Sequence, residues 1–298
     1  MTDLITVTID DREVEVEKGT GLVETAAAAG IEIPVFCYEP RLGPPVGACR
    51  MCLVEIEGLP KLQAGCTLTA QEGMVVRTAA TSERAADGQQ GTLEFILVNH
   101  PLDCPVCDKG GECPLQDLTF RYGPGSTRMT FPKMTFDKPI PVSPLIALDR
   151  ERCILCYRCT RFSSDVAEDG QLIAQNRGAY TEIATFGEDP YRAPFSGNVI
   201  ELCPVGALTS TQYRFQARPW EIQDVPTVCG LCPAGCNVRA TTREGQVKRM
   251  QSRNHPEIDA GWICDKGRFT FPHLGASDRV VEPLARGELG LEPIGWDD

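Results

Sequence analysis

Fifteen cysteines and one histidine of this 298-residue chain sort into four sets of four ligands, with no cysteine left over. The four sets are Cys37, Cys49, Cys52 and Cys66; His100, Cys104, Cys107 and Cys113; Cys153, Cys156, Cys159 and Cys203; and Cys229, Cys232, Cys236 and Cys264. Thiolates and imidazoles are ligands of zinc and of iron–sulfur clusters. An odd number of cysteines does not fit a closed disulfide framework. The sequence therefore predicts four metal centres.

The charge and hydropathy of the chain bear on its partners. The net charge is −12 and the pI about 4.9, whereas nucleic-acid binding needs a basic surface. No apolar run approaches the roughly 20 residues of a membrane-spanning helix, so we expect membrane contact only through partner subunits. The N-terminal segment does not resemble a signal peptide, and we expect a reducing cytosol, where thiols stay free for metals.

Residues 1–80 are predicted to form a small α+β unit. Apolar residues alternate from Ile5 to Val16 across an acidic turn at Asp10-Asp11, which is typical of a β-hairpin. The elements expected after it are a helix over 21–29, ended by Gly30, and strands over 53–57 and 74–78.

A longer helix is predicted next, from a capping Thr81 or Ser82 to about Asn99. Its glycines, Gly88 and Gly91, favour a kink or a late start. Its buried side is expected to carry Leu93, Ile96 and Leu97. Further on, five prolines with little periodicity indicate an extended surface connector. We therefore expect a chain that belongs to a longer protein and has five segments, 1–80, 81–120, the connector 121–148, 149–216 and 217–298.

The first two ligand sets, taken singly, leave the metal open. The first has the spacing C-x11-C-x2-C-x13-C in a β-rich unit, which favours a [2Fe–2S] cluster over a four-cysteine zinc site. The second, with the spacing H-x3-C-x2-C-x5-C, fits zinc and a [4Fe–4S] cubane about equally well. Gly110 and Gly111, between its last two cysteines, suit close backbone approach to a bulky cluster.

The third and fourth sets are typical of [4Fe–4S] clusters. Three cysteines at successive spacings of three, followed by Cys203-Pro204, match the bacterial ferredoxin pattern, which zinc sites rarely use. The fourth set, with the spacing C-x2-C-x3-C-x27-C, also suits a cubane. Four arginines near the third set either offset cluster charge or form a solvated basic face: Arg150, Arg152, Arg158 and Arg161. Together the sets favour iron–sulfur clusters, because a chain of electron carriers needs several centres in one protein.

Five sequence motifs carry a resemblance to a known family. They are GACRMCLVEIEG, NHPLDCPVCDKGGECPLQD, ERCILCYRCTRF, GNVIELCPVGALT and ARPWE. Nearly the whole chain resembles the N-terminal part of the G-subunit (75 kDa subunit) family of bacterial NADH-quinone oxidoreductases, the enzymes known as respiratory complex I. The second motif is highly specific to this family and its close relatives.

The resemblance implies a multi-module α+β fold and its cofactors. The expected modules are a β-grasp [2Fe–2S] ferredoxin module, a helical [4Fe–4S] module with one histidine and three cysteine ligands, a ferredoxin-like [4Fe–4S] module, and the start of a molybdopterin-oxidoreductase-type [4Fe–4S] domain. One [2Fe–2S] and three [4Fe–4S] clusters are thus implied, with iron held by the sixteen residues above. No residue that would ligate molybdenum is visible, and we infer no pterin site.

The implied function is electron transfer in NADH:quinone oxidoreductase, a translocase. The chain is expected to take electrons from a flavin- and NADH-binding subunit and to pass them toward quinone through further iron–sulfur subunits. Its expected place is the peripheral arm, on the cytoplasmic side of the inner (plasma) membrane. We expect no catalytic residue and no NADH site in this chain, which lacks a G-x-G-x-x-G motif.

Three alternatives stay open at this point. The large subunit of a NAD-linked formate dehydrogenase generally carries two ferredoxin-type triplets, whereas this chain carries one. A hydrogenase diaphorase subunit typically ends before a fourth ligand set, which this chain has. A zinc scaffold without enzymatic activity predicts a colourless protein.

Two further hypotheses concern individual sites. We expect His100 to ligate the second cluster through one ring nitrogen while a hydrogen-bond acceptor holds the other. We expect the first three clusters to form the electron path. The set that begins at Cys229 is then a structural or side cluster.

Overall fold

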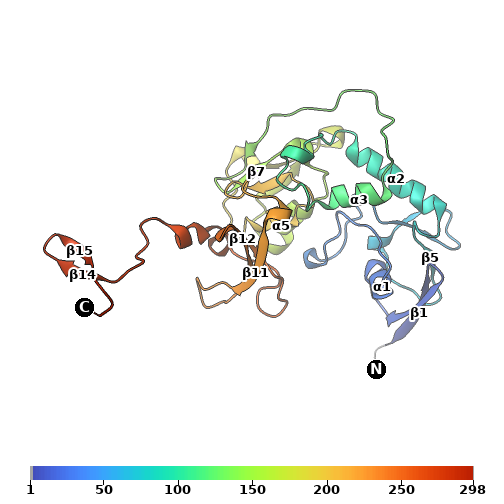
Figure 1. Cartoon of the computed structure of the whole chain (residues 1–298). Helices are drawn as coiled ribbons and strands as arrows, with labels where there is room; N and C mark the ends of the chain where they lie inside the picture. Colours follow the sequence, from blue (N-terminus) through green and yellow to red (C-terminus); the bar gives the residue numbers. More distant parts are fainter. Residues whose placement is uncertain (1–2, 298) are drawn as a thin grey trace.

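The structure of the chain is a computed structural model that describes residues 3–297 (Figure 1). The N-terminal unit lies at one end of the molecule, and a C-terminal hairpin stands away from the body at the other end (Figure 1). After the helix α3 (Pro114–Tyr122), the chain forms a long arch over the outside of the molecule and then returns to its centre (Figure 1).

The N-terminal unit is built on a five-stranded sheet with the order β2-β1-β5-β3-β4. Its elements are β1 (Leu4–Ile9), β2 (Arg12–Glu17), α1 (Leu22–Ala28), β3 (Leu53–Ile56), β4 (Gln63–Ala64) and β5 (Val75–Arg77). Asp10 and Asp11 have φ angles of 47° and 63°, the left-handed conformation of a tight hairpin turn. Gly30, with φ 70°, follows the end of α1. The predicted hairpin, helix and strands are confirmed, whereas β4 was not predicted.

The next helix, α2 (Glu83–Leu97), is uninterrupted. The Ser82 hydroxyl accepts a hydrogen bond from the Ala85 N–H at 3.1 Å, which confirms the predicted cap. The expected kink is wrong. A Cβ atom at Gly88 would lie 2.7 Å from Leu62 Cδ1, so this glycine lets the helix pack closely on the N-terminal unit. Packing therefore outweighs the low helix propensity of glycine.

Three helices and two small sheets follow in the middle of the chain. The helix α3 (Pro114–Tyr122) precedes the arch, and a three-stranded sheet of order β10-β7-β6 follows it. The other elements of this region are β6 (Ile140–Pro141), β7 (Ile146–Leu148), α4 (Arg158–Arg161), the hairpin β8 (Leu172–Gln175) and β9 (Glu182–Thr185), α5 (Asn198–Leu202) and β10 (Leu208–Ser210).

The C-terminal region consists of an antiparallel sheet, a short helix and the outlying hairpin. These elements are β11 (Gln223–Val228), β12 (Asn237–Arg243), β13 (Gln246–Ser252), α6 (Asp265–Phe269), β14 (Leu284–Gly287) and β15 (Gly290–Pro293). Between residues 3 and 297, no helix has the length and apolar character needed to cross a membrane.

One hydrophobic core joins three of these regions. Phe36 and Met51 come from the N-terminal unit, Leu93 from α2, Leu115 from α3, and Phe162 from the middle region, and all of them belong to one buried cluster. A second core lies within the N-terminal sheet alone. The N-terminal and middle regions are therefore held together by apolar packing as well as by any metal.

Candidate iron–sulfur sites

The thiols of the first set lie within hydrogen-bond distance of one another's backbone. The Cys37 N–H donates to Cys49 Sγ at 3.4 Å, and the Cys66 N–H donates to Cys52 Sγ at 3.5 Å. Hydrogen bonds from Cys49 and Cys66 hold the pKa of Cys37 far below its usual range, while Cys37 raises the pKa of both partners. The four thiols thus form one cluster in which a thiolate is stabilised.

The third set lines a cavity inside the shared core, among side chains that include Leu148 and Ile183. Burial raises the pKa of Cys153 and of Cys156 to about 12. A thiolate is therefore costly here unless a cation compensates it. Iron bound by all four sulfurs fits that requirement.

Two of the arginines near the third set fasten it to the N-terminal unit. Arg161 is buried and donates to the carbonyl oxygens of Leu42 at 2.6 Å and Pro44 at 2.7 Å. Arg158 donates to the carbonyl oxygen of Tyr38 at 2.5 Å. Tyr38 follows Cys37, so the loop of the first set is bound directly to α4, the helix that carries Cys159 of the third set.

A third arginine joins the third set to the second. Arg152 is 4% exposed and contacts Asp103 at 2.8 Å and Asp149 at 3.0 Å. Asp103 precedes Cys104, and Arg152 precedes Cys153. The solvated basic face considered for the four arginines is therefore wrong for Arg152 and Arg161, which are buried in ion pairs and hydrogen bonds.

The sulfurs of the second set meet the chain that follows Cys203. A Cβ atom at Gly206 would lie 2.1 Å from Cys107 Sγ, and Cys113 Sγ is 3.7 Å from the Pro204 carbonyl oxygen. Only glycine fits at 206 beside that sulfur. Gly206 was missed by the sequence analysis, although it stands in one of the quoted motifs, because nothing local indicates this contact.

His100 has the character of a metal ligand. Its Nδ1 atom is buried and has no hydrogen-bond partner among residues 3–297. Burial, aided by Lys133 and Arg152, lowers the pKa of His100 to about 4. The ring is therefore neutral, as ligation requires, and a buried nitrogen without a partner fits a site that a cofactor completes.

The fourth set lies at the surface between the β11–β12 connection and α6. Cys232 is exposed, in contrast to the buried cysteines of the third set. A Cβ atom at Gly267 would lie 3.4 Å from Cys229 Sγ and 3.8 Å from Cys264 Sγ, so the two sulfurs face one small space. The Gly267 N–H also donates to Cys264 Sγ at 3.4 Å.

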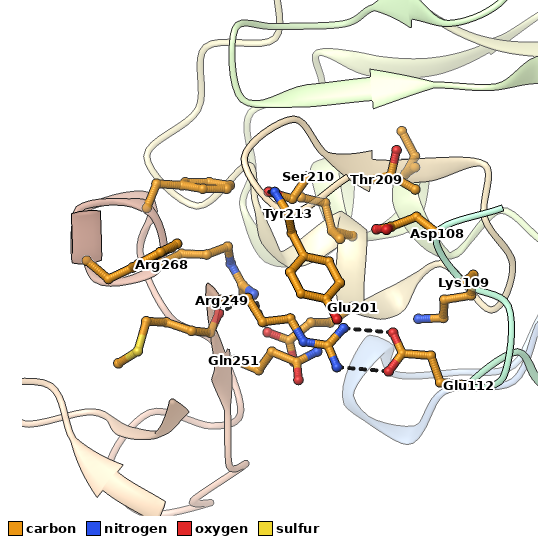
Figure 2. Close-up of a pocket in the computed structure, with 15 residues that line it drawn as sticks. Asp108, Lys109, Glu112, Glu201, Thr209, Ser210, Tyr213, Arg249, Gln251 and Arg268 are labelled. Carbon is orange, nitrogen blue, oxygen red and sulfur yellow. Dashed lines mark hydrogen bonds and ion pairs between the residues drawn. The ribbon is translucent and has the colours of Figure 1, made fainter. Parts of the chain in front are cut away.

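An ion pair attaches the C-terminal region beside the second set. Arg249 of β13 contacts Glu112 through both guanidinium nitrogens, at 2.7 and 2.8 Å, and lies 4.4 Å from the centre of the Tyr213 ring (Figure 2). Glu112 precedes Cys113. Such a bidentate pair fixes orientation as well as distance.

In the part of the chain that the structure describes, no group of three or more histidine, cysteine or acidic side chains is arranged to hold a single metal ion. The ligands of an iron–sulfur cluster are spaced more widely than those of a single ion, because different cysteines bind different irons. A cluster fits three observations: the contacts of Cys107, the unpartnered nitrogen of His100, and the facing sulfurs of Cys229 and Cys264.

Four family models match successive parts of the chain. In chain order they are a 2Fe-2S iron-sulfur cluster binding domain (residues 2–81), the NADH-ubiquinone oxidoreductase-G iron-sulfur binding region (89–128), the ferredoxin-like domain of NADH-quinone oxidoreductase subunit 3 (143–209) and the molybdopterin oxidoreductase Fe4S4 domain (222–274). The predicted order of domain types is confirmed.

Curated relatives match along almost the full chain. The G-subunit of the NADH-quinone oxidoreductase of Streptomyces coelicolor is 50% identical over 99% of this chain, and subunit 3 of the Thermus thermophilus enzyme is 42% identical over 99%. The chain spans 35% and 41% of the lengths of these two relatives.

A solved structure shares the fold of much of the chain. The crystal structure of an NAD+-reducing [NiFe]-hydrogenase in the H2-reduced state contains a chain with a TM-score of 0.63 and 31% identity, and the match covers 72% of this chain and 90% of that one. The two NADH-quinone oxidoreductase relatives match a larger share of this chain, 99%. The chain belongs to the G-subunit family of NADH-quinone oxidoreductases, of which it represents the iron–sulfur part.

Proposed function

We propose that this chain carries electrons through four iron–sulfur clusters in an NADH:quinone oxidoreductase. Membership of the G-subunit family supports this function, as does the series of 2Fe-2S and Fe4S4 domain types along the chain. When bound, the clusters supply one-electron transfer. The oxidoreductase relatives match 99% of the chain and the hydrogenase chain matches 72%, which favours the oxidoreductase over a diaphorase subunit.

We assign the clusters to the ligand sets as the sequence predicts. The [2Fe–2S] cluster belongs to Cys37, Cys49, Cys52 and Cys66, and the three [4Fe–4S] clusters belong to the sets that begin at His100, Cys153 and Cys229. The sheet-based unit that holds the first set matches the 2Fe-2S model, which supports the smaller cluster there. The segment bounds 1–80, 81–120, 121–148, 149–216 and 217–298 remain our proposal for the modules.

The contact of Gly206 with Cys107 is the observation that carries this function furthest. Cys203 is a ligand of the third set, and Gly206, three residues later, contacts the Cys107 sulfur of the second set. Arg158 ties the third set to the residue after Cys37. The third set is thus attached to both the first and the second, and we infer an electron path in the order first, third, second.

The fourth set is attached to the middle region next to α5. Its Cys264 is followed by Asp265, which accepts hydrogen bonds from the Ser196 hydroxyl at 2.5 Å and from the Gly197 N–H at 2.7 Å, just before α5. Those bonds fix the C-terminal region to the middle region. We propose that the fourth cluster stabilises this attachment and does not carry the main electron flow.

The proposed partners and location are those of the family. We propose that a flavin- and NADH-binding subunit donates electrons and that further iron–sulfur subunits pass them toward quinone. We expect the peripheral arm of the complex on the cytoplasmic side of the inner membrane, with this chain contacting the membrane only through those subunits.

Metal and sulfide analysis of the anaerobically purified chain tests the assignment. One [2Fe–2S] and three [4Fe–4S] clusters require about fourteen irons per chain and an equal number of sulfides. A brown protein with four separable electron paramagnetic resonance signals after stepwise reduction is the expected result. Stoichiometric zinc in place of iron at any set would overturn the assignment for that set.

A further inference from the structure

Arg218 lies where the chain passes from the middle region to the C-terminal region, and its side chain reaches back to the second ligand set. Its Nη1 donates to the Cys107 carbonyl oxygen at 2.7 Å, and its Nη2 donates to the Pro105 carbonyl oxygen. Both carbonyls belong to the loop that carries Cys104 and Cys107. The planar fork of a guanidinium suits two acceptors side by side.

The ligand loop has glycines where this contact occurs. A Cβ atom at Gly110 would lie 2.9 Å from Arg218 Nη1, and a Cβ atom at Gly111 would lie 2.9 Å from Trp220 Cζ3. Gly111 also has a φ angle of 92°, which disfavours other residues. The two glycines expected to admit a cluster thus make room for Arg218 and Trp220 as well.

The backbone that presents Arg218 is fixed on its other side. The Arg218 N–H donates to Glu221 Oε2 at 2.8 Å, and Glu221 pairs with Arg243 of β12 at 3.4 Å. Arg243 also donates to the Gln216 carbonyl oxygen at 2.8 Å. The guanidinium therefore extends from an anchored segment, which reduces the entropy lost in holding the loop.

Part of the loop that Arg218 contacts lies at the surface. Cys104 is exposed, and its neighbours Leu102 and Val106 are 89% and 59% exposed. A ligand loop at the surface opens more readily than one in the core, because little apolar area is lost when it moves. Two charge-assisted hydrogen bonds to its backbone counter that opening.

We propose that Arg218 is a positioning residue for the second cluster. Its guanidinium fork keeps the loop of Cys104 and Cys107 closed on the cluster, and its positive charge raises the reduction potential by favouring the more negative, reduced form. This inference rests on the proposed function, because it presumes a cluster at the second set.

Two substitutions distinguish the contact of the planar guanidinium with two carbonyls from the effect of its positive charge. Arg218→Lys keeps the positive charge but cannot hold two carbonyls in one plane, whereas Arg218→Gln removes both properties. Arg286→Gln is the control, since it removes the same charge from an exposed position on β14 of the outlying hairpin, outside the anchored segment.

The measurements use the full 298-residue chain, purified without oxygen. A ferrous-iron chelator is added, and the decay of the second cluster is followed by its electron paramagnetic resonance signal; the midpoint potential of the same signal is titrated separately. We expect Arg218→Gln to lose the cluster roughly tenfold faster and to have a lower potential. Arg218→Lys should lose it faster with a nearly unchanged potential, and Arg286→Gln should match the parent chain in both.

The outcomes distinguish this inference from the function on which it rests. A parent chain without any signal from the second set contradicts the cluster assignment itself. A parent signal whose decay and potential are unchanged in Arg218→Gln overturns only the role of Arg218. Equal loss of all four signals in both Arg218 variants also overturns it, because Arg218 would then support the fold as a whole and not this loop.

Discussion

The second and third ligand sets are neighbours, yet they differ in how far they reach the surface. The third lies in the hydrophobic core, where Cys156, Cys159 and Cys203 are each less than a tenth exposed. The second extends from the core to the edge, since Cys107 and Cys113 are buried but Cys104 is exposed, and its loop is held by Gly206, Arg218 and Arg249. The comparison shows two means of shaping a ligand site: burial in the core, and attachment to distant parts of the chain.

The two designs differ in how cluster binding is coupled to folding. Losing the third cluster leaves a cavity and unpaired thiols within the core that joins the N-terminal and middle regions. Losing the second frees a loop whose Cys104 is exposed, and it leaves one thiol, that of Cys113, unpaired in that core. The third cluster should therefore be coupled to global stability, and the second mainly to local order.

The largest effect is expected from Cys203→Ala. Cys203 follows α5 within the shared core, so we expect loss of the third cluster, and of several kcal/mol of unfolding free energy, because its binding energy is also folding energy. Thermal unfolding under argon, with iron analysis, measures both. Cys104→Ala, at the exposed edge, is the control and should shift the melting temperature much less. Equal shifts in the two variants would contradict the comparison.

Gly206→Ala should affect the second site and not the third. The added methyl group would lie 2.1 Å from the Cys107 sulfur, so we expect the second cluster to be lost while the third remains. Iron falls by about four atoms per chain in that case. Gly91→Ala adds the same methyl group where no atom lies within 4 Å and should keep all clusters. A complete set of clusters in Gly206→Ala would show that the two sites can move apart.

His100 tests whether the edge site depends on a single imidazole. His100→Cys should keep a cubane with an altered electronic spectrum, because a thiolate adds one negative charge, and its reduction potential should fall. His100→Ala should lose or weaken the second cluster without unfolding the core. Spectra identical to that of the parent in both variants would leave His100 without a ligand role.

The smallest effect on electron flow is expected at the fourth set. Replacing Cys232 and Cys236 by alanine should remove about four irons and lower the melting temperature by a few degrees, because the site lies at the surface. Turnover of NADH with quinone, per assembled complex, should stay close to normal. If turnover collapses while the other three cluster signals persist, the fourth cluster lies on the electron path.

Local structure could be predicted well because its causes are local. The acidic turn between β1 and β2, the Ser82 cap of α2 and Gly30 after α1 each act on neighbouring residues. The pairing of β7 with β10 was not predicted, because those strands are short and lie far apart in the sequence. The uninterrupted α2 was mispredicted for a related reason, since the packing of Gly88 on Leu62 involves another segment.

The sequence by itself determined the four ligand sets as candidates, the order of domain types and the family, because spacings and motifs are properties of neighbouring residues. Only the tertiary structure decided that the third set is attached to both the first and the second, that Gly206 faces the Cys107 sulfur and that Arg218 contacts the second loop. Each of these contacts joins distant segments whose approach depends on packing of the whole core. No local pattern encodes such an approach, and the electron path proposed for this chain depends on it.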